Sequence, residues 1–316
     1  MADTKKLKKT VGKSAVRNTI QISAGDRIYY AIVDVLLGVF TIIVLMPLLN
    51  VLASSFSSPE AVNYGWVLFW PVDFSLEGYE AVFEYKGLWQ AYGNTFFYAI
   101  VGTALNITMT MVCAYPMARK NLPGRKWITW LFMFTMYFGG GTIPNYVLVR
   151  KLGMMDTRAA MIIPGAMSVY NMIIARTFIN NIPSELEEAA KVDGCTDTRF
   201  FLQMVLPLSG TVIAVLSLYY AVGHWNDYFT AFIYLKNPSK YPLQIILREI
   251  LMLNAFDSEA AGALADELMN NQSLQDLLKY GLIVISSAPI LILYPFVKKY
   301  FMKGVMIGAF GIFICI

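Results

Sequence analysis

Few residues of this sequence have the types and spacing that chemistry requires. The 316 residues include one histidine, His224, and three widely separated cysteines, Cys113, Cys195 and Cys315. A single histidine argues against a histidine-built metal site, and the cysteine spacing excludes a C-x-x-C motif or a disulfide framework. No G-x-x-x-x-G-K-[ST] loop for nucleotide phosphates occurs. We therefore expect no catalytic, metal or cofactor site on this chain.

Polar and aromatic side chains gather at one point of an otherwise apolar stretch: His224, Trp225, Asn226, Asp227 and Tyr228. Polar groups inside a membrane span are costly, so they are candidates for function. Aromatic faces combined with hydrogen-bonding side chains are typical of sugar binding, and these residues are candidates for lining a translocation path. A hydrogen-bond network between helices explains them equally well. Both explanations also apply to Asn94, Asn106 and Asn171 in other apolar runs.

The composition indicates that membrane-spanning helices position these residues. Charged residues make up 15% of the chain, against about 25% in soluble domains. Hydrophobic residues make up 57%, and the mean hydropathy is +0.54. These values exclude a disordered chain and argue against an ordinary soluble enzyme. A bilayer requires about 20 apolar residues per helix. Six runs meet this requirement, approximately at residues 30–53, 94–117, 127–149, 159–179, 209–235 and 280–301.

The distribution of basic residues predicts the orientation of these spans. With the N-terminus inside, the inner segments hold 17 of the 25 Lys and Arg residues and the outer segments hold 8. Excess positive charge marks the cytoplasmic side, so we expect a cytoplasmic N-terminus. One short outer loop departs from the rule, because it contains Arg150, Lys151 and Arg158.

The simplest organisation is a single membrane domain at residues 28–308, between a basic cytoplasmic tail (1–27) and an apolar C-terminal tail (309–316). We expect an inner loop at 180–208. An outer loop at 236–279 should contain one or two short helices, the first over residues 243–253. The run Gly139–Gly141, followed by Pro144, predicts a hinge or a point of close packing.

The inner loop has the pattern of a capped helix. Pro183 and Ser184 can begin it, and acidic residues fill its first turn, where the helix dipole favours them. Ala189 and Ala190 would form a smooth face for a partner, and Gly194 can end the helix in a left-handed conformation. A second helix over residues 197–205 is expected to end at Pro207.

The loop resembles the E-A-A signature of the membrane permease subunits of bacterial ABC importers. The matching pattern is E-A-A, three residues, Gly194, nine residues, Met204 where isoleucine is usual, one residue, and Leu206-Pro207. Further segments resemble carbohydrate permeases, and most of all those grouped with aldouronate and complex-oligosaccharide transporters. These segments are residues 138–144, 152–157, 164–171, 223–227 and 303–308, within a resemblance that covers about residues 25–310.

The resemblance implies an all-α integral membrane fold with six transmembrane helices of the type I importer kind, and both termini in the cytoplasm of a bacterial cell. It implies a second homologous permease, generally a different chain, and an extracytoplasmic binding protein that delivers an oligosaccharide. It also implies two ATPase subunits that hold ATP and Mg²⁺, and no nucleic acid. A coupling helix would contact an ATPase through Glu187, Glu188, Ala189, Ala190, Asp193, Gly194, Leu206 and Pro207.

Two other functions remain open from the residues alone. An ion-coupled secondary transporter would need ionisable groups in the membrane, and His224 and Asp227 are the main candidates. A membrane enzyme would need a nucleophile–base pair, and none is visible. The apolar tail at 309–316 departs from the polar ending of the family, so no ATPase contact is assigned to it.

Overall fold

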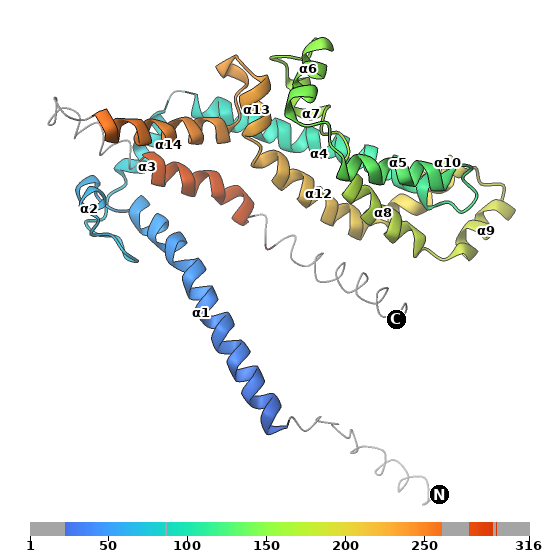
Figure 1. The fold of residues 1–316 in the computed structure, drawn as a ribbon, viewed down its shortest axis with the longest axis horizontal. Helices are drawn as coiled ribbons and strands as arrows, with labels where there is room; N and C mark the ends of the chain where they lie inside the picture. The colour runs from blue at the N-terminus through green and yellow to red at the C-terminus, as the bar shows by residue number, and fades with distance from the viewer. Residues whose placement is uncertain (1–22, 86, 261–277, 293–294, 296–316) are drawn as a thin grey trace, which may run out of the picture. The chain divides into compact units, whose positions relative to one another are not determined.

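A computed structural model describes residues 23–85, 87–260, 278–292 and 295, and the described part is helical. Apart from an isolated bridge between Ser57 and Phe74, it contains no β-structure. Figure 1 shows the helices in chain order. They are α1 (Ala24–Ser55), α2 (Pro59–Asn63), α3 (Glu77–Glu84), α4 (Leu88–Ala118), α5 (Arg125–Tyr137), α6 (Thr142–Lys151), α7 (Arg158–Ile162), α8 (Val169–Asn180), α9 (Ser184–Val192), α10 (Asp197–Phe200), a π-helical turn (Phe201–Val205), α11 (Leu206–Leu208), α12 (Gly210–Trp225), α13 (Phe229–Tyr234), a 3₁₀ turn (Pro238–Lys240), α14 (Leu243–Ala260) and an unnumbered helix, Leu278–Ile292.

The chain divides into two compact units, one ending at Asn50 and the other beginning at Val51. The described part of the first unit is a stretch of α1 that is apolar on every side, and an 18-residue window within Gly25–Ser55 has a mean hydropathy of 2.7. Its large side chains are exposed along the helix. A helix of this length that is apolar all round is suited to cross a membrane. This finding agrees with the predicted first span.

The second unit is organised around α4, whose 31 residues correspond to a length of about 46 Å at 1.5 Å per residue. It agrees with the predicted second span. One side of α4 packs against α8 and α12, and a core of buried side chains lies between them. Small residues on that side, such as Ala99, Gly102 and Ala114, allow the helices to approach closely.

The predicted third, fourth and fifth spans are not single helices, because each is divided into two. The third consists of α5 and α6, separated at Phe138–Gly141, where Gly141 has a φ of +81°. No atom of the described residues lies within 4 Å of an added Cβ at Gly139 or Gly141, so within this part of the chain the glycine run breaks the helix and is not a point of close packing. The fourth consists of α7 and α8, and the fifth of α12 and α13.

Polar side chains of α4 and α12 bind the break between α7 and α8. Asn106 Nδ2 donates to the Gly165 carbonyl, and the Ser168 N–H donates to the Tyr220 hydroxyl at 3.1 Å. The same hydroxyl is 2.8 Å from Thr110 Oγ1. Non-helical backbone is tolerated in a membrane only where protein or a water-filled cavity surrounds it. This network therefore explains how the fourth run can be interrupted.

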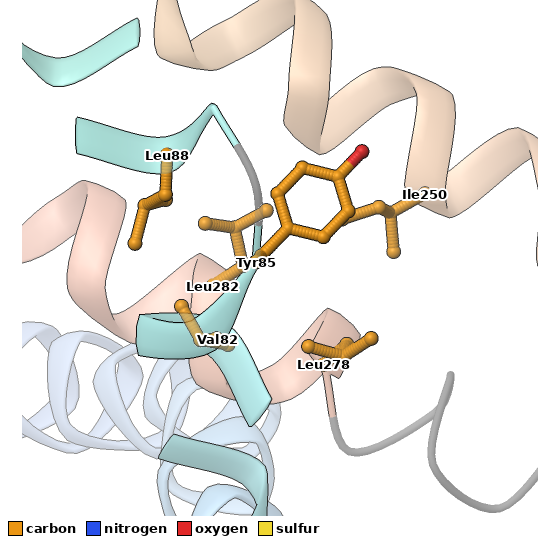
Figure 2. A pocket seen from close by; sticks show the side chains of 6 residues that line it. All are labelled: Val82, Tyr85, Leu88, Ile250, Leu278 and Leu282. Atoms are coloured by element: carbon orange, nitrogen blue, oxygen red, sulfur yellow. The ribbon is translucent and has the colours of Figure 1, made fainter. Parts of the chain in front are cut away.

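A small apolar cluster closes the end of the unit at which α4 begins. Val82, Tyr85 and Leu88 converge on Ile250 of α14 and on Leu278 and Leu282 of the following helix, as Figure 2 shows. These six side chains leave no space for a water molecule. The expected helix over 243–253 is confirmed within α14. For the predicted sixth span, Leu278–Ile292 is helical, and the remainder except residue 295 lies outside the described residues. Most of the N-terminal tail and the whole C-terminal tail also lie outside them.

The closest approach of α4 to α12 generates a stability prediction. An added Cβ on Gly102 would lie 2.7 Å from His224 Cε1 and 2.8 Å from His224 Cδ2. The His224 ring cannot move freely, because its Nε2 donates to Asn106 Oδ1 at 2.6 Å. We expect Gly102→Ala to destabilise the protein by about 1–3 kcal/mol, as overpacked cores do. The measurement is the apparent melting temperature in detergent.

Gly93→Ala on the same helix is the matched control. Nothing lies within 4 Å of its added Cβ. Because alanine favours a helix over glycine by up to about 1 kcal/mol, this variant should match or exceed the melting temperature of the original protein. Equal melting temperatures for the two variants would contradict the close contact.

Candidate coupling surface and translocation path

The inner loop forms the helix that its sequence predicts. α9 follows Pro183, and Glu185 and Glu187 lie in its first turn. Gly194 takes the left-handed conformation with a φ of +72°, and its N–H donates to the Lys191 carbonyl at 3.0 Å. The sequence thus predicted both ends of this helix.

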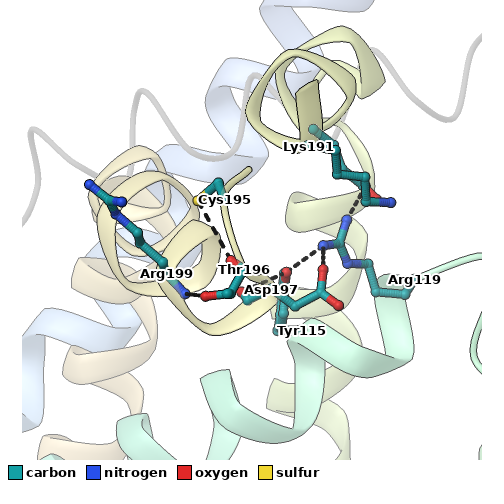
Figure 3. Close-up of polar contacts among 8 residues, drawn as sticks. Tyr115, Arg119, Lys191, Cys195, Thr196, Asp197 and Arg199 are labelled. Carbon is teal, nitrogen blue, oxygen red and sulfur yellow. Dashed lines mark hydrogen bonds and ion pairs between the residues drawn. The ribbon is translucent and has the colours of Figure 1, made fainter. Parts of the chain in front are cut away.

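One cation, Arg119, connects α9 to the end of α4 and to α10. Its guanidinium pairs with the Glu187 carboxylate and lies 2.7 Å from Asp197 Oδ1. It also donates to the Tyr115 hydroxyl and lies over the rings of Tyr115 and Phe200, at 4.8 and 5.3 Å from their centroids. The dashed lines in Figure 3 trace these polar contacts. We call the five residues Tyr115, Arg119, Glu187, Asp197 and Phe200 the arginine clamp.

The clamp orients α9 so that its two sides differ. Ala190 is buried with an exposure of 8%, inside the core between α4, α8 and α12. Ala189 and Glu188 are exposed, and Val192 has 88% of its surface exposed. Ala189 and Ala190, which were expected to form a smooth face for a partner, thus differ in their surroundings, because Ala190 packs against this chain. The predicted coupling residues that stay accessible on this loop are Glu188, Ala189, Asp193 and Gly194.

The helix after α9 continues beyond its predicted end. α10 leads into the π-helical turn, in which the Leu206 N–H donates to the Phe201 carbonyl five residues back. Pro207 follows within α11, and the chain then turns by 77° into α12. Proline has no backbone N–H to donate to a helical hydrogen bond. The wider π-helical turn that precedes Pro207 accommodates this residue, so the helix does not end at Pro207. Leu206 is half-buried and Pro207 is exposed.

Two of the predicted path residues are held inside the chain. Trp225 is buried, and its indole N–H donates to the Ser286 carbonyl at 3.0 Å. His224 is bonded to Asn106 of α4. The explanation by a hydrogen-bond network between helices therefore accounts for both of these side chains and for Asn106.

The predicted asparagines on α4 and α8 are also buried. Asn94 Nδ2 donates to the carbonyls of Ser239 and Tyr241 at 2.8 and 3.1 Å, and its Oδ1 accepts from Arg158. Asn171 is 7% exposed, and its N–H lies within the cap that Ser168 makes for α8. Asn94 thus fixes the segment between α13 and α14 onto α4.

Three predicted path residues lie at the break between α12 and α13. Asn226 and Tyr228 are exposed, and Asp227 is half-buried. Asp227 Oδ1 accepts from the Thr230 N–H at 3.0 Å, so it caps α13. Of the candidates for the path, Asn226 and Tyr228 are the two whose side chains are exposed.

Asp156 anchors the same segment from the other side. Its Oδ1 accepts from the N–H groups of Lys236 and Asn237, both at 3.1 Å, and its Oδ2 lies 3.2 Å from Lys240 Nζ. These backbone donors, helped by Lys240, hold the pKa of Asp156 below its ordinary value of 3.8. Asp156 also has a positive φ of 54°.

Sequence reasoning missed Arg119, Asp156 and Tyr220, which organise these sites. In the sequence, Arg119 contributed only one charge to the number of basic residues in the inner segments. The sequence did contain a signal for Asp156, because residues 152–157 (L-G-x-x-D-T) were part of the family resemblance. That segment gave no indication of the groups to which Asp156 binds. No signal predicted that Tyr220 reaches Ser168 across 52 residues of sequence.

Comparison with known proteins places this arrangement in a family. The model of the family described as "Binding-protein-dependent transport system inner membrane component" matches residues 110–254. The polygalacturonan/rhamnogalacturonan transport system permease protein YtcP of Bacillus subtilis (strain 168) is 36% identical over 284 residues, which cover 90% of this chain and 98% of the relative. The chain belongs to this family of permeases.

Two further matches extend over nearly the same length. The permease is 36% identical to protein LplC of the same organism over 292 residues, or 92% of this chain and 98% of LplC. It also matches the crystal structure of a bacterial ABC transporter involved in the import of the acidic polysaccharide alginate. This match has a TM-score of 0.79 and 31% identity, and it covers 88% of this chain and 98% of that chain.

The family membership decides among the functions that the residues left open. The permease is a membrane component of an ABC importer, which works together with an ATPase and a binding protein. The ion-coupled alternative is not supported, because the relatives are ABC permeases. In the structure His224 is hydrogen-bonded to Asn106. This bond gives His224 a packing role, so no ion-coupling role is needed to explain it.

The arginine clamp predicts how firmly the permease holds α9. Arg119→Gln removes one of the two cations that pair with the Glu187 carboxylate, and it leaves Lys191 Nζ 2.6 Å from Glu187 Oε1. Loss of hydrogen bonds to a charged group costs about 1.5–3 kcal/mol. We therefore expect amide hydrogen exchange across α9 to accelerate at least about tenfold. Lys120→Gln, an exposed neighbour, is the control and should leave exchange unchanged. Similar exchange in both variants would argue against the clamp.

The lowered pKa of Asp156 predicts the acid response of the segment at residues 236–241. A carboxyl group with a depressed pKa stabilises the folded state above its ordinary pKa and loses this contribution as the pH falls through the folded value. Pepsin cleavage in this segment should therefore increase as the pH is lowered below 3.8. In Asp156→Asn, cleavage should already be high and should not respond to pH in this way. An identical response in both proteins would refute the anchoring role.

Proposed function

We propose that this permease carries an oligosaccharide across the bacterial plasma membrane by alternating access, and that its partner ATPase subunits drive it through α9. The relatives support a carbohydrate substrate, since the printed name of YtcP includes polygalacturonan and rhamnogalacturonan and the solved transporter imports alginate. ATP and Mg²⁺ would bind to the ATPase subunits, and this chain would perform no chemistry on the sugar.

The observation that carries the coupling role is the two-sidedness of α9. Its inner side is fixed by Arg119 and Ala190, whereas Glu188, Ala189 and Val192 are exposed. An exposed valine on a helix that is otherwise firmly attached favours contact with another protein, because burying apolar surface stabilises a complex. We assign this face to an ATPase subunit.

The clamp gives the coupling step a physical route. Closure of the ATPases on ATP would push α9, and Arg119 would transmit the displacement to the end of α4. The other end of α4 holds the segment between α13 and α14 through Asn94 and through Thr95, whose Oγ1 accepts from the Leu243 N–H at 2.8 Å. A helix of this length can therefore link the ATPase side to the side on which a binding protein would deliver the sugar.

We further propose six spans with both termini in the cytoplasm. Two described helices, α1 and α4, are long and apolar enough to span alone, and the bent pair of Asp197–Leu208 and Gly210–Trp225 passes the same test together. The remaining spans would be the divided pairs α5–α6 and α7–α8, and a helix beginning at Leu278. The bias of basic residues toward the inner segments supports the orientation.

A second homologous permease, as a different chain, would complete the path. The described part of α5 has no buried residue, and Trp127 and Trp130 are 82% and 72% exposed. Gentle purification from native membranes tests these partners. Recovery of an ATPase, a second permease and a binding protein would support the assembly, and recovery of this chain alone would oppose it.

Glu188→Lys tests the coupling role directly. Because the Glu188 side chain is exposed, the variant should fold and insert into the membrane. Its reversed charge should disrupt the ATPase contact and reduce sugar uptake at least about tenfold, which corresponds to a loss of about 1.4 kcal/mol. Glu80→Lys makes the same change at an exposed glutamate on α3 and should leave uptake unchanged. The measurement is uptake of labelled sugar by cells with equal amounts of membrane-inserted permease. Normal uptake by Glu188→Lys would count against α9 as the contact.

A further inference from the structure

The predicted outer segments contain more basic residues than the positive-inside rule leads us to expect. Arg150, Lys151 and Arg158 crowd one loop, and the next holds Lys236, Lys240 and Arg248 among others. Two of these cations have structural partners, since Lys240 pairs with Asp156 and Arg158 donates to Asn94. Arg248 differs from both, because within the described residues no carboxylate lies within ion-pair distance of it.

Arg248 is positioned by aromatic rings. From α14 its guanidinium carbon lies 4.2 Å from the ring centroid of Phe232 and 5.9 Å from that of Tyr228. Tyr228 lies in the break between α12 and α13, and Phe232 lies about one turn into α13; the two residues are 43% and 54% exposed. A cation over aromatic faces is stabilised by the ring quadrupole. Among the described residues, the two rings therefore hold the guanidinium without using the N–H groups along its edge.

We propose that Arg248, mounted on Phe232 and Tyr228, binds the carboxylate of an acidic sugar unit in the translocation path. This inference rests on the proposed oligosaccharide import and specifies its substrate class as uronate-containing. A guanidinium edge matches a carboxylate in a bidentate geometry. The exposed parts of the two rings offer an apolar surface to the sugar, and the exposed amide of Asn226 lies two residues before Tyr228.

The chemistry of this site selects against neutral sugars. A neutral oligosaccharide has no group that requires a cation, and placing one beside the Arg248 guanidinium brings no charge pairing. The printed names of the relatives include a galacturonan, which is a polymer of an uronic acid, and an acidic polysaccharide.

The test uses the complete transporter with its binding protein in proteoliposomes. The probes are trigalacturonate and its methyl ester, which lacks the negative charges. Arg248→Gln should reduce uptake of trigalacturonate about tenfold, the effect of losing one charged hydrogen-bond pair. Uptake of the ester and ATP hydrolysis without sugar should stay unchanged. Arg150→Gln, which removes the same charge from an exposed position on α6, should retain uptake of both probes.

The outcomes separate this inference from the proposed function. Equal loss of both probes in Arg248→Gln, or an equal loss of trigalacturonate in Arg150→Gln, would overturn the specific role of Arg248 and leave oligosaccharide import standing. Transport of the ester but not of trigalacturonate by the original complex would overturn the acidic substrate class. If the original complex carries only trigalacturonate, loss of uptake with unchanged ATP hydrolysis in Arg248→Gln supports the site, and unchanged uptake refutes it. Failure of the coupling proposal would appear elsewhere, as normal uptake by Glu188→Lys.

Discussion

Within the hydrocarbon layer of a membrane, a backbone N–H or C=O that a helix break leaves open finds no water to bond. In the described residues, three of the apolar runs are interrupted, and α4 supplies partners for one of these breaks and for the segment beside another. Asn106 reaches the Gly165 carbonyl, Thr110 joins the Tyr220 hydroxyl that accepts from Ser168, and Asn94 reaches the carbonyls of residues 239 and 241. The arrangement of α7, α8 and α12 depends on these bonds.

The side chains that make these bonds are distributed along the length of α4, at Asn94, Asn106 and Thr110. At one end they hold the segment before α14, in the middle they hold the break before α8, and at the last turn Tyr115 and Arg119 hold α9 and α10. A continuous helix thus contacts the inner loop and the predicted outer segment. Because these contacts share one rigid element, a displacement at one level changes the geometry at the others.

The sequence predicted the local features of this molecule well and the distant contacts poorly. Caps, first-turn acids and a terminal glycine are local, so both ends of α9 could be predicted from residues 183–194. Hydropathy predicted where the apolar runs lie, but it averages over many residues and cannot detect a break of three to six residues within a run. The partners of Asn94 and Trp225 could not be predicted, because each depends on a carbonyl more than 60 residues away. The types of Trp225, Asn94 and Asn171 had suggested that they line the path. Their burial in the structure then argued against this role.

The π-helical turn at Phe201–Val205 has a consequence for how this part of the sequence can vary. A π-helical turn holds one residue more than an α-helical turn would, and that residue sets the rotation of everything that follows. Removing a single residue from this turn would return it to an α-helix and rotate the following chain by about 100°. Tyr220 and His224 would then face away from Thr110 and Asn106 of α4. The stretch between α9 and α12 can therefore accept substitutions far more readily than a change in length.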